Sequence, residues 1–290
     1  MAATPLFFEL SSRIKLEVRG GDALRFLNGQ LTNDVRKSAA HTAIEACVLN
    51  TKGKIDAHVF IRALGDGSLL DAEPEHRDAL QARLDRYIIA DDVTLTDVTN
   101  NWSLFHVIGE SEINRIKVAA NRFGVWGHDI LVSAADHDVV RGELQQQFVF
   151  VGEDAAEIYR IEQGIPRWGR ELTADVNPTE ANLEERAIDF AKGCYIGQEV
   201  ISRMKMSGQT NKRLCGLTIR PPSIITAPAR LRNMTDGKDV GWITSVTRSE
   251  RLNATIALGF VKRGFDAIGT SLRSGEGDEA KVDVVALPFR

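Results

Sequence analysis

The chain has 290 residues, of which 43% are hydrophobic and 26% are charged. This composition supplies enough apolar side chains for a large core and excludes a disordered chain. The formal net charge of −4 argues against a general nucleic-acid coat protein. No uncharged apolar run approaches the roughly 18 residues that a membrane span needs. The N-terminus carries no signal- or transit-peptide pattern, so we expect a cytoplasmic protein without a membrane partner.

The first hundred residues alternate between strand and helix patterns. Residues 14–18 alternate as a strand does, and Gly20-Gly21-Asp22 predicts the start of a helix with Asp22 as its N-cap residue. A second helix is predicted over residues 74–89, with Pro74 in its first turn. The other strand patterns lie at residues 43–50, 54–63, 68–72 and 93–98. This order is that of a split βαβ lobe in an α+β sheet.

A similar order then repeats more loosely. Strand patterns cover residues 102–108 and 130–133, and helix patterns cover residues 111–118, 137–147 and 153–163. Beyond Met206-Ser207-Gly208 the chain changes to short strand patterns, at residues 214–220, 229–233, 240–247, 255–261 and 282–286. We therefore predict an α+β body over residues 1–206 and a small C-terminal β-barrel domain over residues 207–290.

One segment stands out chemically and reads K-G-C-Y-I-G-Q-E over residues 192–199. The glycines Gly193 and Gly197 allow tight backbone turns around Cys194, and a helix is predicted to begin just after them. The ammonium of Lys192 and a helix N-terminus both favour a thiolate over a thiol. From the residues alone, Cys194 is either a reactive or ligating thiol or a buried structural cysteine.

The other cysteines and the histidines give no sign of a metal site. Cys47 and Cys215 lie in apolar strand patterns, where we expect them to pack in the interior. The chain has three cysteines and six histidines, with no C-x-x-C and no H-E-x-x-H spacing. We therefore expect no resident metal ion.

Residues 192–199 resemble the signature of the folate-binding YgfZ family, which belongs to the superfamily of the glycine-cleavage aminomethyltransferase, the T-protein. Other segments resemble family motifs in the same order along the chain: residues 26–35 (F-L-x-G-Q-x-T-x-D-V), 159–166 (R-x-E-x-G-I-P), 177–183 (P-x-E-x-x-L) and 241–245 (G-x-I-T-S). The resemblance implies a T-protein-like fold, a three-lobed ring of two related split βαβ lobes and a β-barrel around tetrahydrofolate. It also implies a functional motif that includes Gly193, Tyr195, Gly197, Gln198 and Glu199.

For the folate site, the resemblance implies that Glu162 accepts the adjacent N–H and amino groups of the pterin as a bidentate pair. The alternative for Glu162 is a helix-surface carboxylate paired with Arg160. Arg203 and Lys205, one to two turns beyond the motif, are the candidates for holding the carboxylate tail of folate. An aromatic partner for the folate ring is expected, but the sequence does not rank Trp168, Phe190 and Tyr195.

Two aspartates bear on whether a reaction is catalysed. T-proteins carry adjacent aspartates after a G-G-x-I turn, whereas the stretch Gly53-Lys54-Ile55-Asp56-Ala57 keeps only Asp56. This difference speaks against aminomethyl transfer. Asp34 is a candidate general base, with the alternative that Thr32-Asn33-Asp34 forms an Asx turn.

Three functions follow from these observations. The first, implied by the resemblance, is a tetrahydrofolate-binding accessory protein that supports assembly or repair of iron–sulfur clusters in client enzymes such as radical-SAM tRNA-thiolating enzymes. Cys194, activated by Lys192, is then a nucleophile or a transient cluster ligand. The alternative is a folate-dependent one-carbon transferase, an aminomethyltransferase or a demethylase. A third hypothesis is direct RNA binding by residues 200–235, which hold seven Lys and Arg residues and no Asp or Glu.

Overall fold

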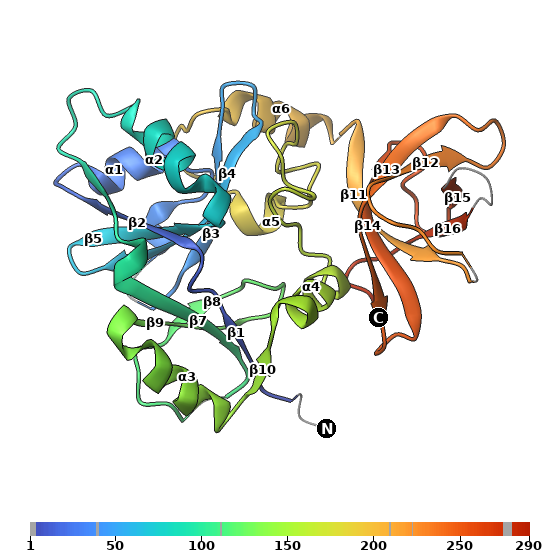
Figure 1. Cartoon of the computed structure of the whole chain (residues 1–290). Helices are drawn as coiled ribbons and strands as arrows, with labels where there is room; N and C mark the ends of the chain where they lie inside the picture. The colour runs from blue at the N-terminus through green and yellow to red at the C-terminus, as the bar shows by residue number, and fades with distance from the viewer. Residues whose placement is uncertain (1–3, 39–40, 111, 209, 222, 275–279) are drawn as a thin grey trace. The chain divides into compact units, whose positions relative to one another are not determined.

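The computed structural model describes residues 4–290, except 39–40, 111, 209, 222 and 275–279 (Figure 1). It has the predicted α+β class, with sheets and helices in the first part of the chain and a barrel in the last. The chain forms two compact units: Met1–Glu153 with Glu184–Val200, and Asp154–Leu183 with Ile201–Arg290. Residues 154–183 group with the C-terminal strands in this division. The boundary near residue 207 stays a prediction.

The first unit contains a five-stranded antiparallel sheet with the order β3-β4-β5-β2-β6 (Figure 1). Its strands, all predicted, are β2 (Ile14–Arg19), β3 (Ile44–Leu49), β4 (Ile55–Leu64), β5 (Gly67–Ala72) and β6 (Thr94–Asp97). Helices α1 (Ala23–Gln30) and α2 (Arg77–Asp85) cover one face. Their apolar side chains and those of the sheet form a single core.

Strand β4 shows why this sheet has two different faces. Its odd-numbered residues Ala57, Val59 and Ile61 belong to the helix-covered core. Because side chains alternate along a strand, the even-numbered residues point to the other face. His58 and Arg62 on that face are also buried. The first unit therefore buries charged groups as well as apolar surface.

Both helices of this sheet differ in detail from their predictions. Asp22 stands at the N-cap position of α1 but makes no capping hydrogen bond, and its carboxylate accepts one from the Asp92 amide at 3.0 Å. The predicted helix over residues 74–89 is a 3₁₀ turn, η2 (Pro74–His76), followed by α2, which ends at Asp85. Beyond Asp85 the chain leaves the helix, although Ile88 of the predicted apolar face still packs against the core.

A second five-stranded sheet in the first unit has the order β10-β1-β7-β9-β8. Its strands are β1 (Leu6–Glu9), β7 (Trp102–Ile108), β8 (Val118–Ala120), β9 (Gly127–Ser133) and β10 (Val149–Val151). Helix α3 (His137–Gln145) packs on it through Val140 and Leu144. The Ala43 amide donates to the Ala119 carbonyl at 2.8 Å and joins this sheet to the chain entering β3.

The predicted helix over residues 111–118 is wrong. The described residues 112–117 form no helix, and Val118 begins strand β8. Ile113 is buried, whereas Ile116 is 77% exposed. Residues three apart share one face of a helix, so this burial pattern does not suit an amphipathic helix. Residue 111 lies outside the described part of the chain.

The second unit is built around a closed barrel with the strand order β11-β14-β13-β12-β15-β16. Its strands are β11 (Lys212–Ile219), β12 (Ala229–Asn233), β13 (Asp239–Ser249), β14 (Ala254–Lys262), β15 (Ser271–Ser274) and β16 (Ala280–Val285). Leu217, Ile243 and Val282 are fully buried in its core. The barrel confirms the prediction for this region, although β15 was missed because its sequence Ser-Leu-Arg-Ser has one apolar residue.

Three further α-helices are α4 (Glu153–Glu162), α5 (Glu184–Ala187) and α6 (Gln198–Ser207). Short 3₁₀ helices are η1 (Val35–Lys37), η3 (Thr99–Asn101) and η4 (Ala134–Asp136). Within the described ranges, no helix combines the length and the apolar character needed to cross a membrane.

Candidate functional site

The segment that contains Cys194 is a loop that leads into helix α6. Lys192 and Tyr195 are both 7% exposed, whereas Gly193 and Cys194 between them are exposed. The helix begins at Gln198, directly after the loop, as predicted. The loop therefore presents its thiol between two buried side chains.

Exposure separates Cys194 from the other two cysteines. Cys47 and Cys215 are buried, as predicted, and burial raises the pKa of both thiols, that of Cys215 to about 12. Cys194 is exposed, so the alternative of a buried structural cysteine is excluded. Among the described residues, no group of three or more His, Cys, Asp or Glu side chains is arranged to hold a metal ion.

The ammonium of Lys192 contacts the backbone. Its Nζ donates to the carbonyl oxygens of Asn28 at 2.7 Å, Leu31 at 2.5 Å and Asn33 at 3.0 Å. An ammonium has three hydrogens, and these three bonds use all of them. Any effect of Lys192 on the Cys194 thiol is therefore limited to its charge.

The hydrogen-bond partners of the Lys192 ammonium are neutral backbone carbonyl groups and not carboxylates. Burial lowers the pKa of the Lys192 ammonium to about 8, although Asp34 and Asp189 attract the charge. Both carboxylates already bind other cations, Asp34 with Arg36 at 2.7 Å and Asp189 with Lys37 at 2.7 Å. The carbonyl groups thus solvate Lys192 without fully replacing water.

The N-terminal motif, residues 26–35, lies against the chain that leads to Cys194. The Thr32 hydroxyl donates to the Ala187 carbonyl at 2.6 Å. The Asn33 side-chain amide donates to the Arg186 carbonyl at 3.2 Å. The sequence placed these two motifs about 160 residues apart without showing that they meet. In the fold they form one structural unit.

Asp34 occupies a turn and is not placed as a general base. Its Oδ1 accepts from the Arg36 amide at 3.1 Å, which is the Asx turn that the sequence left as an alternative. The Arg36 guanidinium also binds both carboxylate oxygens, at 2.8 and 2.7 Å. The hydrogen bonds from Arg36 lower the pKa of Asp34.

Gly197 marks a close approach between the Cys194 loop and the β3–β4 turn. Its φ is +84°, and a Cβ atom there would lie 2.7 Å from the Asn50 carbonyl oxygen. Glycine meets both conditions without strain. Gly193 has no heavy atom within 4 Å of an added Cβ, so the two motif glycines differ in their steric requirement.

Glu162 is in the second unit, at the end of α4. It is 5% exposed, with Oε1 accepting from the Ser249 hydroxyl and Oε2 from Arg251 Nε at 2.8 Å. Arg160 instead donates to Glu171 at 2.8 Å, because residues two apart on a helix point to different sides. The surface pairing of Glu162 with Arg160 is therefore not formed. A carboxylate accepts about four hydrogen bonds, so Glu162 retains acceptor capacity.

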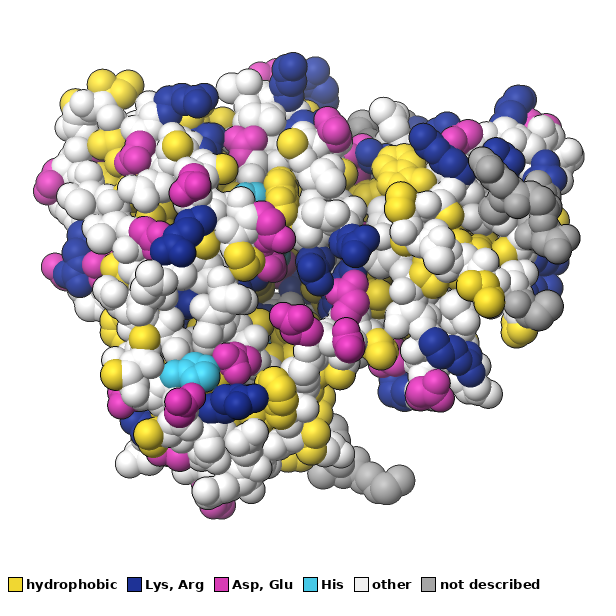
Figure 2. All heavy atoms as spheres, viewed as in Figure 1, with side chains coloured by type: hydrophobic (Ala, Val, Ile, Leu, Met, Phe, Trp, Pro, Cys, Tyr) yellow, Lys and Arg dark blue, Asp and Glu magenta, His cyan; other side chains and the backbone are white. Residues whose placement is uncertain are grey.

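Arg203 and Lys205 are exposed on α6. The wider basic window, residues 200–235, makes several ion pairs within the second unit: Arg220–Asp283 at 2.5 Å, Arg230–Asp239 at 3.2 Å and Lys212–Glu180 at 3.8 Å. Figure 2 shows one face of the molecule, which carries both basic and acidic side chains. This arrangement does not support the hypothesis of a continuous RNA-binding patch.

Asp56 faces a pocket of about 270 Å³ that Arg83 and Arg86 also line. Its Oδ2 accepts from Arg83 Nε at 2.9 Å. Arg83 is itself fixed by a 2.8 Å bond to the Leu49 carbonyl. Asp56 is therefore held in an ion pair with Arg83.

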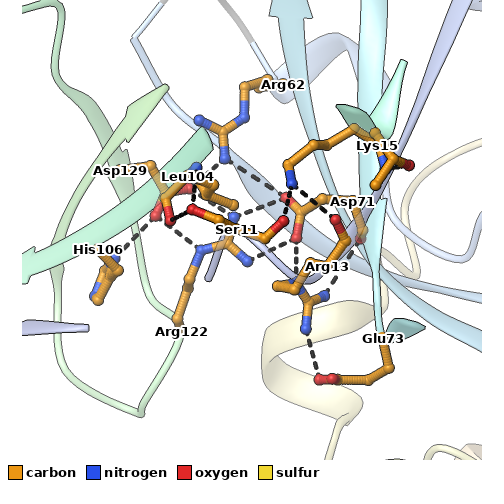
Figure 3. A network of polar contacts seen from close by, with 11 residues as sticks. Ser11, Arg13, Lys15, Arg62, Asp71, Glu73, Leu104, His106, Arg122 and Asp129 are labelled. Atoms are coloured by element: carbon orange, nitrogen blue, oxygen red, sulfur yellow. Dashed lines mark hydrogen bonds and ion pairs between the residues drawn. The ribbon is translucent and has the colours of Figure 1, made fainter. Parts of the chain in front are cut away.

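A buried ion network in the first unit was not predicted from the sequence (Figure 3). Arg122 donates two hydrogen bonds to Asp71, at 2.9 and 2.7 Å, and two to Asp129, at 2.8 and 2.7 Å. Arg13 binds Asp71, and Arg62 binds both aspartates. The signal was present in the sequence, as charged residues inside otherwise apolar strand patterns.

This network joins the two sheets of the first unit, since Asp71 lies in β5 and Asp129 in β9. Burial disfavours the Asp129 carboxylate, but Arg122 and Arg62 outweigh it and hold the pKa of Asp129 well below its ordinary value. Burial likewise opposes the charge of Arg122, and the two aspartates still raise the pKa of its guanidinium. Arginines bind both aspartates, although Arg62 Nε and Nη1 are buried without a hydrogen-bond partner among the described residues. Because its ion pairs link the two sheets, we assign the network to the architecture.

Family models of known proteins match two parts of the chain, the N-terminal part and the C-terminal barrel. Residues 4–115 match the family model described as "GCVT N-terminal domain", and residues 212–290 match the "Glycine cleavage T-protein C-terminal barrel domain". The chain is 28% identical to an aminomethyltransferase of Shouchella clausii, over 97% of this chain and 85% of that protein. It is 31% identical to an uncharacterized protein of Haemophilus influenzae, over 71% of each.

Among solved structures, the glycine cleavage system aminomethyltransferase T of Bartonella henselae superposes with a TM-score of 0.86. The alignment covers 99% of this chain and 87% of that one, at 19% sequence identity. At this identity the likeness establishes the fold, and it agrees with the predicted T-protein-like architecture of two α+β lobes and a barrel.

Proposed function

The chain belongs to the glycine cleavage T-protein superfamily, and from this membership we propose that it binds tetrahydrofolate and supports iron–sulfur enzymes through Cys194. The observation that supports the proposal is that this chain has one acid where T-proteins have two, and has an exposed cysteine, Cys194, in a motif of its own. The acid pair of T-proteins is reduced to Asp56, which is bound to Arg83 at 2.9 Å. An exposed thiol, Cys194, stands instead on a loop fixed to the first unit.

Glu162 is the proposed anchor for the pterin ring of folate. Its carboxylate is buried and keeps acceptor positions beyond its bonds to Ser249 and Arg251. A buried carboxylate suits the pterin because the ring presents two neighbouring N–H donors. The Arg251 side chain is 52% exposed, so it has room to adjust when Glu162 accepts another donor. Bound tetrahydrofolate would supply one-carbon chemistry.

Arg203 and Lys205 are the proposed partners of the folate tail. Both are exposed on α6, and cationic side chains are suited to the carboxylates at the end of folate. The remaining motif residues have supporting roles in this proposal: Tyr195 and Gly197 fix the loop, while Gln198 and Glu199 form the first turn of α6.

Cys194 is the proposed contact with the iron–sulfur client. A four-iron or two-iron cluster uses four protein ligands, and Cys194 supplies one thiolate. The client enzyme or an assembly protein must then supply the others, which makes Cys194 a transient ligand or a nucleophile. We propose cytoplasmic clients such as radical-SAM enzymes that thiolate tRNA.

A folate-dependent one-carbon transferase is the second candidate. Two observations favour it: matched relatives named as aminomethyltransferases, and Asp56 at a pocket of about 270 Å³. Turnover of a defined amine by the purified chain with tetrahydrofolate, abolished by Asp56→Asn, would establish this function and displace the accessory role.

Calorimetric titration with tetrahydrofolate tests the cofactor proposal. We expect binding by the wild type and by Cys194→Ser, and an affinity about ten- to a hundredfold lower for Glu162→Gln, the loss typical of a charged hydrogen bond. Glu153→Gln, an exposed acid at the other end of α4, is the matched control and should bind as the wild type does. Absence of binding by the wild type would contradict the cofactor proposal.

Complementation tests the thiol. In cells that lack the chain, the activity of iron–sulfur tRNA-thiolating enzymes should be restored by the wild type and not by Cys194→Ser. Cys215→Ser serves as the control for loss of a cysteine, because that thiol is buried. Full restoration by Cys194→Ser would contradict a role for the thiol while leaving folate binding to the calorimetric test.

A further inference from the structure

We propose that Lys192 is a positioning residue that fixes the Cys194 loop onto the end of helix α1, and that it does not activate the thiol by contact. The inference rests on the proposed function only for the use to which the thiol is put. Its geometric evidence comes entirely from the first unit.

The end of helix α1 requires a donor at this place. The last four carbonyl groups of an α-helix have no partner within the helix, and Asn28 belongs to the last turn of α1. Lys192 Nζ donates to the Asn28 carbonyl at 2.7 Å and to the Leu31 carbonyl, just beyond the helix, at 2.5 Å. A cation at a helix C-terminus is also favoured by the helix dipole. Lys192 is therefore a C-terminal cap supplied from a distant part of the chain.

Additional contacts fix the other end of the loop. The Ile196 amide donates to the Gly29 carbonyl at 3.2 Å. The Tyr195 ring is buried, with its centroid 5.1 Å from Lys192 Nζ. Gly197 approaches the Asn50 carbonyl so closely that a Cβ would not fit. Gly193 and Cys194 are thus two exposed residues between Lys192 and Tyr195, which are buried and held by their contacts.

The groups around Lys192 fit a positioning role better than activation. Asp34, Asp189 and Arg36 are the charged groups that act on it, and the two aspartates bind other cations. The Lys192 hydrogens all point to carbonyl oxygens. Removing the ammonium would free three carbonyl groups and the end of α1, whereas the thiol would lose only a through-space charge.

Hydrogen exchange and thiol modification of the full-length chain test the proposal together. The first readout is the exchange rate of the Ile196 amide, and the second is the pH midpoint of Cys194 modification by a small disulfide reagent. In Lys192→Met we expect Ile196 to exchange about ten- to a hundredfold faster, as loss of charged hydrogen bonds would cause. We expect the midpoint of Cys194 modification to stay unchanged, because the Lys192 hydrogens bind carbonyl oxygens and not the thiol.

Lys192→Arg separates geometry from charge. Arginine keeps the positive charge but cannot place three hydrogens on these carbonyls from one nitrogen. Positioning therefore predicts that Ile196 also loses protection in Lys192→Arg, and this variant carries the test if Lys192→Met does not fold. Lys52→Met, at an exposed position in the β3–β4 turn, should match the wild type in both readouts.

The opposite result would overturn the proposal. A midpoint shifted upward by more than about one pH unit in Lys192→Met and unchanged in Lys192→Arg, with Ile196 protection intact in both, would identify Lys192 as an electrostatic activator. Neither readout involves folate or a client enzyme. A failure of the proposed function would therefore leave this result standing, and the reverse also holds.

Discussion

Two buried cations of the first unit, Arg122 and Lys192, are held in opposite ways. Arg122 is clamped by the carboxylates of Asp71 and Asp129, with hydrogen bonds of 2.7 to 2.9 Å. Lys192 is held by three neutral carbonyl groups. Burial acts against both charges, yet the pKa of Arg122 is raised and that of Lys192 is lowered to about 8. The two carboxylates more than offset the loss of hydration of Arg122, whereas the carbonyl dipoles offset that of Lys192 only in part.

This difference matches the positions of the two groups. The Arg122 network joins two sheets and has no exposed reactive neighbour among its described members, so its charges serve the architecture (Figure 3). The Lys192 contacts lie under an exposed thiol. A charge held by dipoles responds to pH near 8, and it ties the end of α1 to the loop that presents Cys194.

The largest expected effect comes from breaking the ion network. Arg122→Met leaves Asp71 and Asp129 buried with fewer cations and should lower the free energy of unfolding by about 3–5 kcal/mol, as breaking a buried ion pair typically does. Denaturant unfolding at pH 7 measures it. The control is Arg77→Met, which removes the exposed Arg77–Asp97 pair and should cost at most about 1 kcal/mol. Equal losses of unfolding free energy in both variants would show that the buried network stabilises the fold no more than an exposed ion pair does.

Substitution of the two motif glycines, Gly193 and Gly197, should change the free energy of unfolding by a smaller amount and by different amounts at the two positions. Gly197→Ala introduces a Cβ 2.7 Å from the Asn50 carbonyl oxygen at a φ of +84°, and should destabilise the chain by about 1–3 kcal/mol. Gly193→Ala meets no atom within 4 Å and should stay within about 0.5 kcal/mol of the wild type. Thermal unfolding of the two variants side by side checks the prediction. A tolerated Gly197→Ala would mean that the loop is not pressed against the β3–β4 turn.

The pH response of Lys192 gives the third test. Its pKa is about 8 in the fold against an ordinary value of 10.5. Between these two pH values the unfolded chain holds a proton that the folded chain has released, so the free energy of unfolding rises with pH. Lys15, whose pKa burial also lowers to about 8, adds a slope of the same sign. The difference between wild type and Lys192→Met, measured by urea unfolding from pH 7 to 10.5, isolates Lys192. A slope identical in both proteins would disprove the assignment.

The smallest expected effect is a change in the pKa of Lys192 when the carboxylate of Asp34 is removed. Asp34 attracts the Lys192 charge, so Asp34→Asn should lower the pKa of Lys192 further below 8. A carbon NMR titration of the lysine ε-methylene group measures this shift. Asp66→Asn, which removes an exposed acid paired with Arg19, should leave the Lys192 titration unchanged. A rise in the Lys192 pKa in Asp34→Asn would show that Asp34 does not attract the Lys192 charge.

Much of the fold was predictable from periodicity. Strands β2 to β7 and helices α1 and α3 were found because their apolar residues repeat with the period of the element. The helix predicted over residues 111–118 failed because Ile113 found a core and Ile116 did not. Short strands such as β15 were missed because four residues with one apolar side chain carry no periodic signal.

The site was predictable only in part. The K-G-C-Y-I-G-Q-E string singled out Cys194, and its exposure on the approach to α6 agrees with an accessible thiol. The partner of Lys192 was not predictable, because the carbonyl oxygens of Asn28, Leu31 and Asn33 are backbone atoms that every residue has. Nothing in side-chain chemistry marks which carbonyl groups a helix end leaves without partners.

The sequence by itself determined the class of the fold, the barrel strands other than β15 and which cysteine stands among glycines, because these depend on local period and composition. Tertiary structure alone decided which distant groups meet. It brought residues 26–35 to the Cys194 loop, paired Glu162 with Arg251 instead of Arg160, and enclosed Arg122 between two aspartates. These contacts join residues between 7 and 164 positions apart, and contacts of that kind depend on the packing of whole sheets and helices, which no local pattern records.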